Sequence, residues 1–155
     1  MNLLKGGAWI GALLVGAAVF AAASNVDGAG RSASGDERLA TVARVIDGDT
    51  FVTSDGARIR VRNFDTPELR GHACPEERAA AEGARRAARQ LLTAQTVRLR
   101  VSNQDRYGRL VADVAVLRGD GELDFVSTMV ATGHGARWEY GRERQPIWCP
   151  QLASR

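Results

Sequence analysis

The spacing of apolar residues changes twice along this chain, and the change restricts the folds that the chain can adopt. On both sides of a central segment, apolar and polar residues alternate, which is typical of strands with one buried face. Turn sequences such as Asp47-Gly48 and Ser54-Asp55-Gly56 separate these segments. The pattern predicts five strands: Leu39–Ile46, Thr50–Thr53, Arg58–Val61, Thr96–Val101 and Leu110–Leu117.

Between the third and fourth of these strands the period becomes helical. Alanines and a leucine recur at helical spacing from Glu76 to about Thr93, and Pro75 suits the first position of such a helix. A second, shorter helix is predicted over Asp124–Thr132, before Gly133. This order of elements predicts a five-stranded OB-type barrel, in an α+β fold that is mainly β.

The first residues of the chain have the composition of an export signal. No charged residue lies between Lys5 and Asp27, and the apolar run ends in small residues. We expect residues 1–23 to be a signal peptide or an N-terminal membrane anchor, since about 20 apolar residues cross a bilayer. The protein would then be periplasmic or secreted, or anchored by residues 6–26 with its domain outside the membrane.

The remainder of the chain is expected to contain a linker and one domain. Residues 24–37 are rich in glycine and serine, as flexible linkers are, and residues 38–151 suffice for one compact domain. The two cysteines, Cys74 and Cys149, both lie in this exported part, where a disulfide is permitted. They form either one bridge or two buried thiols, and the residues alone leave both possibilities open.

The charge distribution is compatible with a nucleic-acid partner but does not require one. Twenty of the 21 basic residues are arginines, which bind phosphate through two hydrogen bonds at once, although a GC-rich genome gives the same bias. From Glu76 to Arg109 there are eight arginines and four acids, while the formal net charge of the chain is only +3. The histidines, His72 and His134, lack zinc spacing, and we expect both to be structural or surface residues.

Two acidic turns contain the oxygen ligands that a hard cation prefers. In the first turn, Asp47 and Asp49 flank Gly48. An EF-hand is excluded, because the twelfth residue counted from Asp47 is Arg58, where that motif needs a bidentate glutamate. An ordinary structural turn remains an alternative for this sequence.

In the second turn, Asp65 and Glu68 flank Thr66 and Pro67. Proline fixes its own φ and favours an extended residue before it, so the Thr66 carbonyl can lie beside the Asp65 carboxylate as a second oxygen ligand. Taken alone, this turn is also common loop sequence, and the structural alternative again remains open.

Arginines accompany the acidic turns. Alternation places Arg58, Arg60 and Arg62 on one strand face and does not distinguish between them. Asp105–Arg109 (DRYGR) is a polar turn between two predicted strands. Its Tyr107 would contact a nucleobase or cover the end of the barrel.

Taken in order, these motifs resemble the staphylococcal nuclease (thermonuclease) family. The matching features are IDGDT at 46–50, DTPE at 65–68 with Arg60 five residues before its aspartate, and DRYGR at 105–109. The resemblance spans about Thr41 to Ala136. It implies an OB-type barrel and a calcium-dependent enzyme that cleaves single- or double-stranded DNA and RNA and leaves 3'-phosphate ends. We expect the protein to be a monomer.

The resemblance also implies roles for individual residues. The matches are Asp49, Asp65 and the Thr66 carbonyl as calcium ligands, Glu68 as general base, Arg60 and Arg109 as catalytic arginines, and Arg106 and Tyr107 as substrate contacts. The alternative is a catalytically inactive OB-type module that binds nucleic acid. Such a module has no need of a general base and two catalytic arginines, so we favour catalysis.

The sequence departs from the family pattern at three places. Cys74-Pro75 replaces a longer lysine-rich loop, and Val126 occupies a position where the family often has asparagine. The stretch from Gly133 to Tyr140 does not align with the aromatic nucleotide contacts of the family. We therefore expect Trp138 and Tyr140 to pack in the core or on the surface, outside the site.

Overall fold

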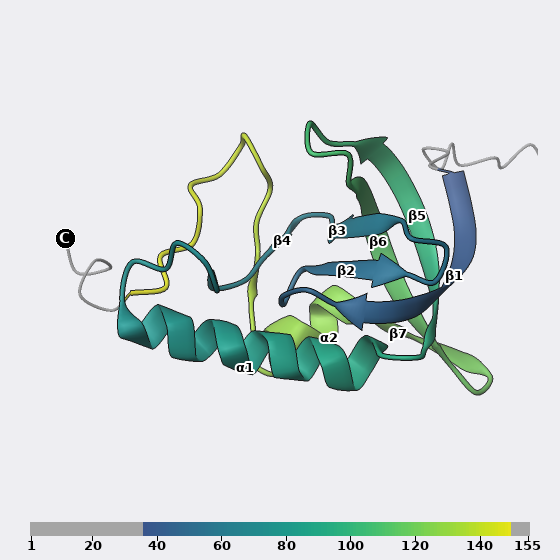
Figure 1. Cartoon of the computed structure of the whole chain (residues 1–155), viewed down its shortest axis with the longest axis horizontal. Coiled ribbons are helices and arrows are strands. Elements are labelled where there is room, and N and C mark those ends of the chain that lie inside the picture. The colour runs from purple at the N-terminus through teal and green to yellow at the C-terminus, as the bar shows by residue number, and fades with distance from the viewer. Residues whose placement is uncertain (1–35, 150–155) are drawn as a thin grey trace, which may run out of the picture. The chain divides into compact units, whose positions relative to one another are not determined.

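The computed structural model of the protein describes residues 36–149, which contain eight strands and two helices (Figure 1). The elements are β1 (Asp36–Val45), β2 (Thr50–Thr53), β3 (Arg58–Val61), β4 (Phe64–Asp65), α1 (Pro75–Leu92), β5 (Thr96–Gln104), β6 (Leu110–Arg118), β7 (Gly121–Asp124), α2 (Phe125–Ala131) and β8 (Ala136–Arg137). The predicted signal peptide or anchor, and the linker up to residue 35, lie outside the described residues. Neither of the two described helices is long and apolar enough to cross a membrane.

Five strands form a closed barrel in the order β3-β2-β1-β5-β6, and a parallel pairing between β3 and β6 closes it. Strand β7 pairs with the second half of β6, beyond the residues that pair with β3, and the short strands β4 and β8 pair with each other. The predicted fold class, a five-stranded OB-type barrel in an α+β chain that is mainly β, is confirmed. Closure brings residues that are distant in sequence side by side, as for Ile59 and Leu110.

Strand β1 belongs to both halves of the barrel. Residues Asp36–Thr41 pair with β5, whereas residues from Val42 to Val45 pair with β2. The register shifts between Val42 and Arg44, as it does at a β-bulge, which bends a strand and increases its twist. One strand can therefore turn the corner of the barrel and pair with two different partners.

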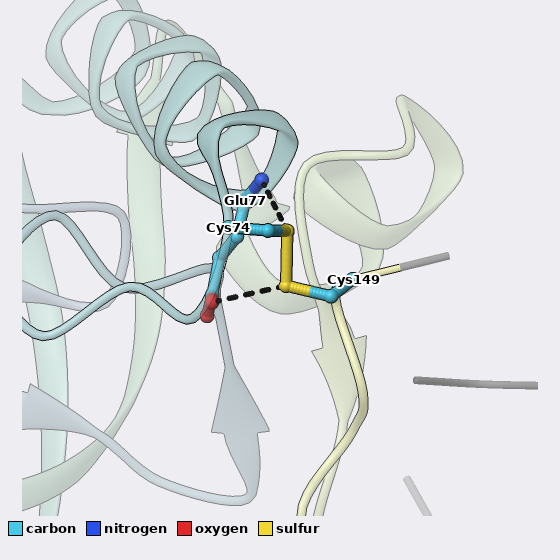
Figure 2. Close-up of side chains that lie close together, drawn as sticks. All are labelled: Cys74, Glu77 and Cys149. Carbon is cyan, nitrogen blue, oxygen red and sulfur yellow. Dashed lines mark hydrogen bonds between the residues drawn. A yellow bond between two sulfur atoms is a disulfide. The ribbon is translucent and has the colours of Figure 1, made fainter. Parts of the chain in front are cut away.

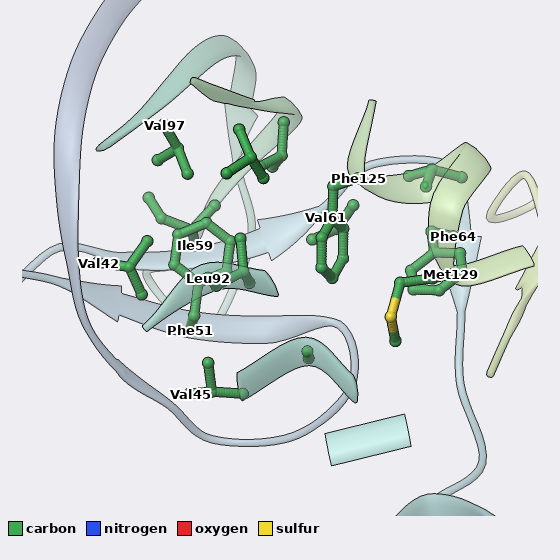
Figure 3. Close-up of a cluster of buried hydrophobic side chains, with 14 of the residues drawn as sticks. Val42, Val45, Phe51, Ile59, Val61, Phe64, Leu92, Val97, Phe125 and Met129 are labelled. Carbon is green, nitrogen blue, oxygen red and sulfur yellow. The ribbon is translucent and has the colours of Figure 1, made fainter. Parts of the chain in front are cut away.

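The barrel interior is filled by apolar side chains from strands and both helices (Figure 3). The largest fully buried side chains include Phe51, Ile59, Phe64, Leu92, Leu99, Phe125 and Met129. The rings of Phe64 and Phe125 meet edge to face with their centroids 6.0 Å apart, which joins β4 to α2. The core therefore reaches from the barrel to the elements that carry the acidic turns.

Helix α1 lies along one side of the barrel with α2 beside it (Figure 1). Cys74 is its N-cap, with Sγ accepting from the backbone N–H of Glu77 at 3.4 Å. Pro75 takes the first helical position, where a missing N–H costs nothing. The buried face consists mainly of alanines, which allow close approach to the barrel.

The predicted strands and helices are present, with some differences at their ends. Strand β1 begins at Asp36, before the predicted Leu39, and includes the last two residues of the expected linker. Strands β4, β7 and β8 were not predicted, because segments of two to four residues carry too little periodicity. Val126, where the family often has asparagine, is buried in the core.

Candidate active site

Two strand pairings bring the sequence motifs to one rim of the barrel. Pairing of β2 with β3 sets Thr50 opposite Arg60, so that Asp49, next in sequence, lies beside the same arginine. Pairing of β3 with β6 aligns Arg60 with Val111. The turn Asp105–Arg109 leads directly into β6 and is therefore brought to Arg60 as well.

These elements surround an open pocket of about 370 Å³. All eight residues that the sequence singled out for the site line it: Asp49, Arg60, Asp65, Thr66, Glu68, Arg106, Tyr107 and Arg109. The other lining residues are Asp47, Thr50, Pro67, Trp138, Tyr140 and Gln145. Four carboxylates and three guanidinium groups thus share one space, which suits a cation and a phosphate together.

The carboxylate side of the pocket is built from two turns in direct contact. Asp49 and Asp65 are both buried, and Asp49 Oδ1 accepts a hydrogen bond from Thr50 Oγ1 at 2.8 Å. Gly48 lies against Thr66, because a β-carbon at this glycine would lie 2.7 Å from Thr66 Cγ2. The glycine is therefore needed for the first turn to approach the second.

Arg60 lies between the two buried aspartates. Its Nη1 is 2.9 Å from Asp49 Oδ2, and its Nη2 is 3.6 Å from Asp65 Oδ1. Nη1 also donates to the carbonyl oxygens of Phe64 at 2.8 Å and Val61 at 3.1 Å. These contacts from the turn before β2, from β3 and from β4 fix the orientation of the guanidinium group at the pocket wall.

The three arginines that alternation left equivalent have different surroundings. Arg58 is exposed. Arg62 donates to both carboxylate oxygens of Asp113, at 2.9 and 2.6 Å. Of the three, Arg60 alone lines the pocket that contains the acidic turns.

Burial and mutual repulsion raise the pKa values of three carboxyls in the pocket. Burial first, and then the neighbouring Asp49 charge, raise the pKa of Asp47 to about 7. Burial is also the main cause of a raised pKa at Asp65 and at Glu68, and Asp49 adds to both shifts. The positive charge of Arg60 acts to lower the pKa of all three groups, but it does not offset the rise. A further cation would stabilise their charged forms.

Glu68 lies at the rim of the pocket, in the loop that leads to α1. Its side chain is exposed to solvent, although the protein packed behind it still raises its pKa. Its backbone N–H donates to Glu77 Oε1 at 3.3 Å, and the Ala73 N–H donates to Glu77 Oε2 at 2.6 Å. The buried Glu77 carboxylate therefore binds both ends of the loop that carries Glu68.

The DRYGR turn is organised by its own aspartate. The Asp105 carboxylate accepts hydrogen bonds from Tyr107 N at 2.9 Å, Arg109 N at 3.0 Å and Arg109 Nε at 2.7 Å. Burial alone would raise the pKa of Asp105, but these hydrogen bonds lower it below its ordinary value. Gly108 has a φ of +74°, which favours glycine. The guanidinium groups of Arg106 and Arg109 both lie over the Tyr107 ring.

The end of the domain supplies residues that the sequence did not assign to the site. Strand β8 pairs with β4 and leads to Trp138 and Tyr140, which line the pocket. The expectation that these two aromatic residues lie outside the site is therefore wrong. Gly135 permits the pairing, because a β-carbon there would overlap the Phe64 ring. No local pattern predicts this, since the position depends on a two-residue strand.

A disulfide joins Cys74 at the start of α1 to Cys149, so the chain contains the bridge and not two free thiols (Figure 2). The Cys149 sulfur lies 3.7 Å from Glu77 Oε2. Trp148, adjacent to the bridge, donates from Nε1 to Asp65 Oδ2 at 3.1 Å. No local sequence pattern singles out Trp148, because nothing local connects it to an aspartate so far away in the chain.

A second cavity, of about 700 Å³, adjoins the first pocket. The two share six lining residues: Arg60, Arg106, Tyr107, Arg109, Trp138 and Tyr140. Polar side chains such as Asn63, Asn103 and Gln104 line the rest of the second cavity. The space beside the arginines is therefore large enough for more than one phosphate group.

The ligand atoms in the first pocket are suited to a hard cation. Asp49, Asp65 and Thr66 offer oxygen atoms. Burial, and then the charge of Asp49, raise the pKa of Asp65, and a cation such as calcium would favour its charged form. Within residues 36–149, the only group of three His, Cys, Asp or Glu side chains whose ligand atoms all lie within 4.8 Å of one another is Cys74, Glu77 and Cys149. Its two sulfurs are bonded to each other, so this group is not a metal site.

Residues 58–146 match the family model for staphylococcal nuclease homologues. The chain belongs to the staphylococcal nuclease family. The matched residues include Arg60 and both the DTPE and DRYGR motifs, while IDGDT lies just before them. No curated protein matches the chain. The staphylococcal nuclease family consists generally of hydrolytic nucleases, so this is a nuclease-like domain whose expected substrate is nucleic acid.

Proposed function

We propose that the protein is a calcium-dependent nuclease that hydrolyses phosphodiester bonds of DNA and RNA and leaves 3'-phosphate ends. The supporting observation is that Arg60, Glu68 and Arg109 line one pocket together with Asp49 and Asp65. A module that only binds nucleic acid needs the arginines, but it gains nothing from a carboxylate base beside buried acidic ligands.

Glu68 acts as the general base in the proposed reaction. Its carboxylate takes a proton from a water molecule, and the water oxygen attacks phosphorus in line with the 5'-oxygen. The bond from phosphorus to the 5'-oxygen breaks and the 5'-oxygen takes a proton from solvent in the open pocket, so the phosphate stays on the 3' side. The exposed position of Glu68 gives water access, and its raised pKa makes it a stronger base than an ordinary carboxylate.

Arg60 and Arg109 stabilise the negative charge that develops on the phosphoryl oxygens. Arg60 is held on the barrel by Asp49, Asp65 and two carbonyl oxygens, and Arg109 is held by Asp105. Both guanidinium groups are oriented before substrate binds, so little reorganisation is needed during the reaction.

Calcium would be bound by Asp49, Asp65 and the Thr66 carbonyl, and it would supply Lewis-acid stabilisation beside the phosphate. The family typically uses calcium, and the oxygen ligands of this pocket suit it. The adjoining cavity would take a nucleoside, because Tyr107, Trp138 and Tyr140 offer aromatic rings on which bases stack.

We also propose that the domain works outside the cytoplasm, either secreted or periplasmic, or on an anchor formed by residues 6–26. The uncharged N-terminal stretch supports export. The Cys74–Cys149 bridge supports it independently, because disulfides persist in oxidising compartments.

The decisive experiment is digestion of DNA and RNA by the purified chain with calcium or with excess EGTA, with the ends of the products analysed for 3'-phosphate. We expect cleavage with calcium and none with EGTA. Glu68→Gln should lower turnover by about two to four orders of magnitude, because general-base catalysis contributes that much. Arg58→Ala is the matched control, since Arg58 is exposed on the same strand as Arg60.

Three results would contradict the proposal. Undiminished cleavage in EGTA would remove calcium from the reaction. Full activity of Glu68→Gln would remove the assigned base. Tight binding of nucleic acid without any cleavage would favour the inactive binding module.

A further inference from the structure

The C-terminal segment, residues 138–149, contacts the site but belongs to no helix or strand. Among the described residues, no backbone–backbone hydrogen bond connects positions 144–149 to the rest of the domain. Apart from the peptide chain itself, the covalent attachment of this described stretch to the domain is the bridge at Cys149, which is buried. The position of this stretch therefore depends on the disulfide and on side-chain contacts.

The contact of this stretch that matters most for the site is between Trp148 and Asp65. Trp148 Nε1 donates to Asp65 Oδ2 at 3.1 Å, whereas Asp65 Oδ1 lies 3.6 Å from Arg60 Nη2. The two oxygens of one carboxylate thus have different partners. The indole, together with the Gln145 side chain of the same stretch, orients the carboxylate and leaves Oδ1 on the side of Arg60.

The bridge is attached at a rigid point close to the same site. Cys74 is the N-cap of α1, and Glu77 in the first helical turn accepts the Glu68 N–H. The Cys149 sulfur lies against the Glu77 carboxylate (Figure 2). The start of α1 therefore connects the loop that carries the proposed base with the stretch that carries Trp148.

We propose that Trp148 is a positioning residue for Asp65 and that the Cys74–Cys149 bridge keeps its indole in contact with that carboxylate. The inference rests on the proposed calcium site. A hydrogen-bond donor to a metal-binding carboxylate orients it, and loss of such a partner typically weakens metal binding about 10- to 100-fold. A stretch without backbone pairing requires a tether to keep such a donor in place.

The first test measures calcium binding to the full chain by titration calorimetry, without substrate. Trp148→Phe keeps an aromatic ring and removes the N–H, so calcium affinity should fall about tenfold. The melting temperature in EGTA should change little. Ile147→Ala is the control, because Ile147 is the exposed neighbour of Trp148 and lines neither cavity. Its calcium affinity should equal that of the unmodified chain.

The second test asks whether the bridge acts through Trp148. Cys74→Ala with Cys149→Ala should weaken calcium binding to a similar degree, and adding Trp148→Phe should weaken it no further, because both changes remove the same contact. Circular dichroism checks that the barrel is folded. A chain with two glycines inserted between Trp148 and Cys149 keeps the bridge but lengthens the connection between the indole and the bridge. It should show the same loss even if the bridgeless variant fails to fold.

Each outcome decides one part of the inference. Unchanged calcium affinity in Trp148→Phe would overturn the positioning role while leaving the proposed function intact. Additive losses, or an unaffected glycine-insertion variant, would overturn the tethering role of the bridge. Absence of calcium binding by the unmodified chain would remove the calcium site, and this inference with it.

Discussion

The two sides of the pocket position their side chains in different ways. On the carboxylate side, Asp49 and Asp65 are buried and contact groups from other elements, namely Arg60 on β3 and Trp148 near the end of the domain. On the side of the DRYGR turn, Arg109 is bound by Asp105, four residues earlier in the chain.

The side chains on one side of the pocket therefore depend on tertiary contacts, and those on the other side depend on contacts within one turn. The carboxylate side depends on barrel closure and on the disulfide, so changes there should alter stability and chemistry together. The DRYGR turn is organised by contacts within five residues, so changes there should alter chemistry and leave the barrel intact.

Among the changes that compare the two sides, the largest effect is expected from removing the two arginines. Arg60→Ala and Arg109→Ala should each lower kcat by about 10²- to 10³-fold, as loss of one donor to a developing oxyanion does. Arg60→Ala alone should also lower the free energy of unfolding, by about 3 kcal/mol, because it leaves two buried carboxylates without a cationic partner. Single-turnover kinetics and urea unfolding in EGTA measure the two quantities. Equal loss of stability in both variants would contradict the contrast.

The next effect is a pH dependence of stability that has opposite signs on the two sides. The folded-state pKa of Asp47 is about 7 and its ordinary value is 3.8, so the folded state binds the proton more strongly. The contribution of Asp47 to the free energy of unfolding is present below pH 3.8 and is lost as pH rises towards 7, by about 1.4 kcal/mol per pKa unit. Stability in EGTA should therefore fall by a few kcal/mol over this range, and Asp47→Asn should flatten the fall.

Asp105 provides the comparison on the DRYGR side. Its folded-state pKa is lowered, so its contribution is present above pH 3.8 and is lost as pH falls through the folded-state value. Urea titrations of Asp47→Asn and Asp105→Asn from pH 3 to 8 should thus change opposite ends of the profile. If both variants changed the stability profile at the same end of the pH range, the direction given for one of the two pKa shifts would be wrong.

A smaller effect is expected where the two acidic turns touch. Gly48→Ala places a β-carbon against Thr66 and should cost about 1 to 3 kcal/mol of stability through overpacking. It should also weaken calcium binding, because Thr66 carries a proposed ligand. Gly121→Ala is the matched control, since its nearest contact would be 3.9 Å away. Calorimetry on both variants measures stability and calcium affinity, and similar behaviour would argue against the tight contact.

The smallest effect is expected at the exposed end of the DRYGR turn. Tyr107 is 61% exposed, and Tyr107→Ala should raise KM severalfold, because stacking on one base contributes about 1 kcal/mol or more. Tyr107→Phe keeps the ring and should retain the original KM, although it loses the hydroxyl that accepts from Arg106. Steady-state kinetics on single-stranded DNA test this. A KM that rises equally in both variants would show that the hydroxyl, and not the ring, contacts substrate.

The sequence by itself determined most of the architecture and the motif residues of the site. Alternation, turn residues and helix signals act over a few neighbouring residues, so five strands and two helices were predictable without tertiary contacts. The DRYGR turn is local in the same sense, because Asp105 binds groups two and four residues away. The order of motifs along the chain then placed Asp49, Asp65 and Glu68 in one family pattern.

The tertiary structure alone decided what depends on contacts between distant residues. Closure of the barrel by β3 and β6 separates Arg60 from Arg58 and Arg62, which alternation left equivalent. The pairing of β4 with β8 brings Trp138 and Tyr140 to the pocket. The fold also brings Cys74 and Cys149 together as a bridge, and it places the neighbouring Trp148 beside Asp65. These choices are absent from local patterns because they rest on packing between segments far apart in the chain, where a two-residue strand or a single glycine determines which side chains meet.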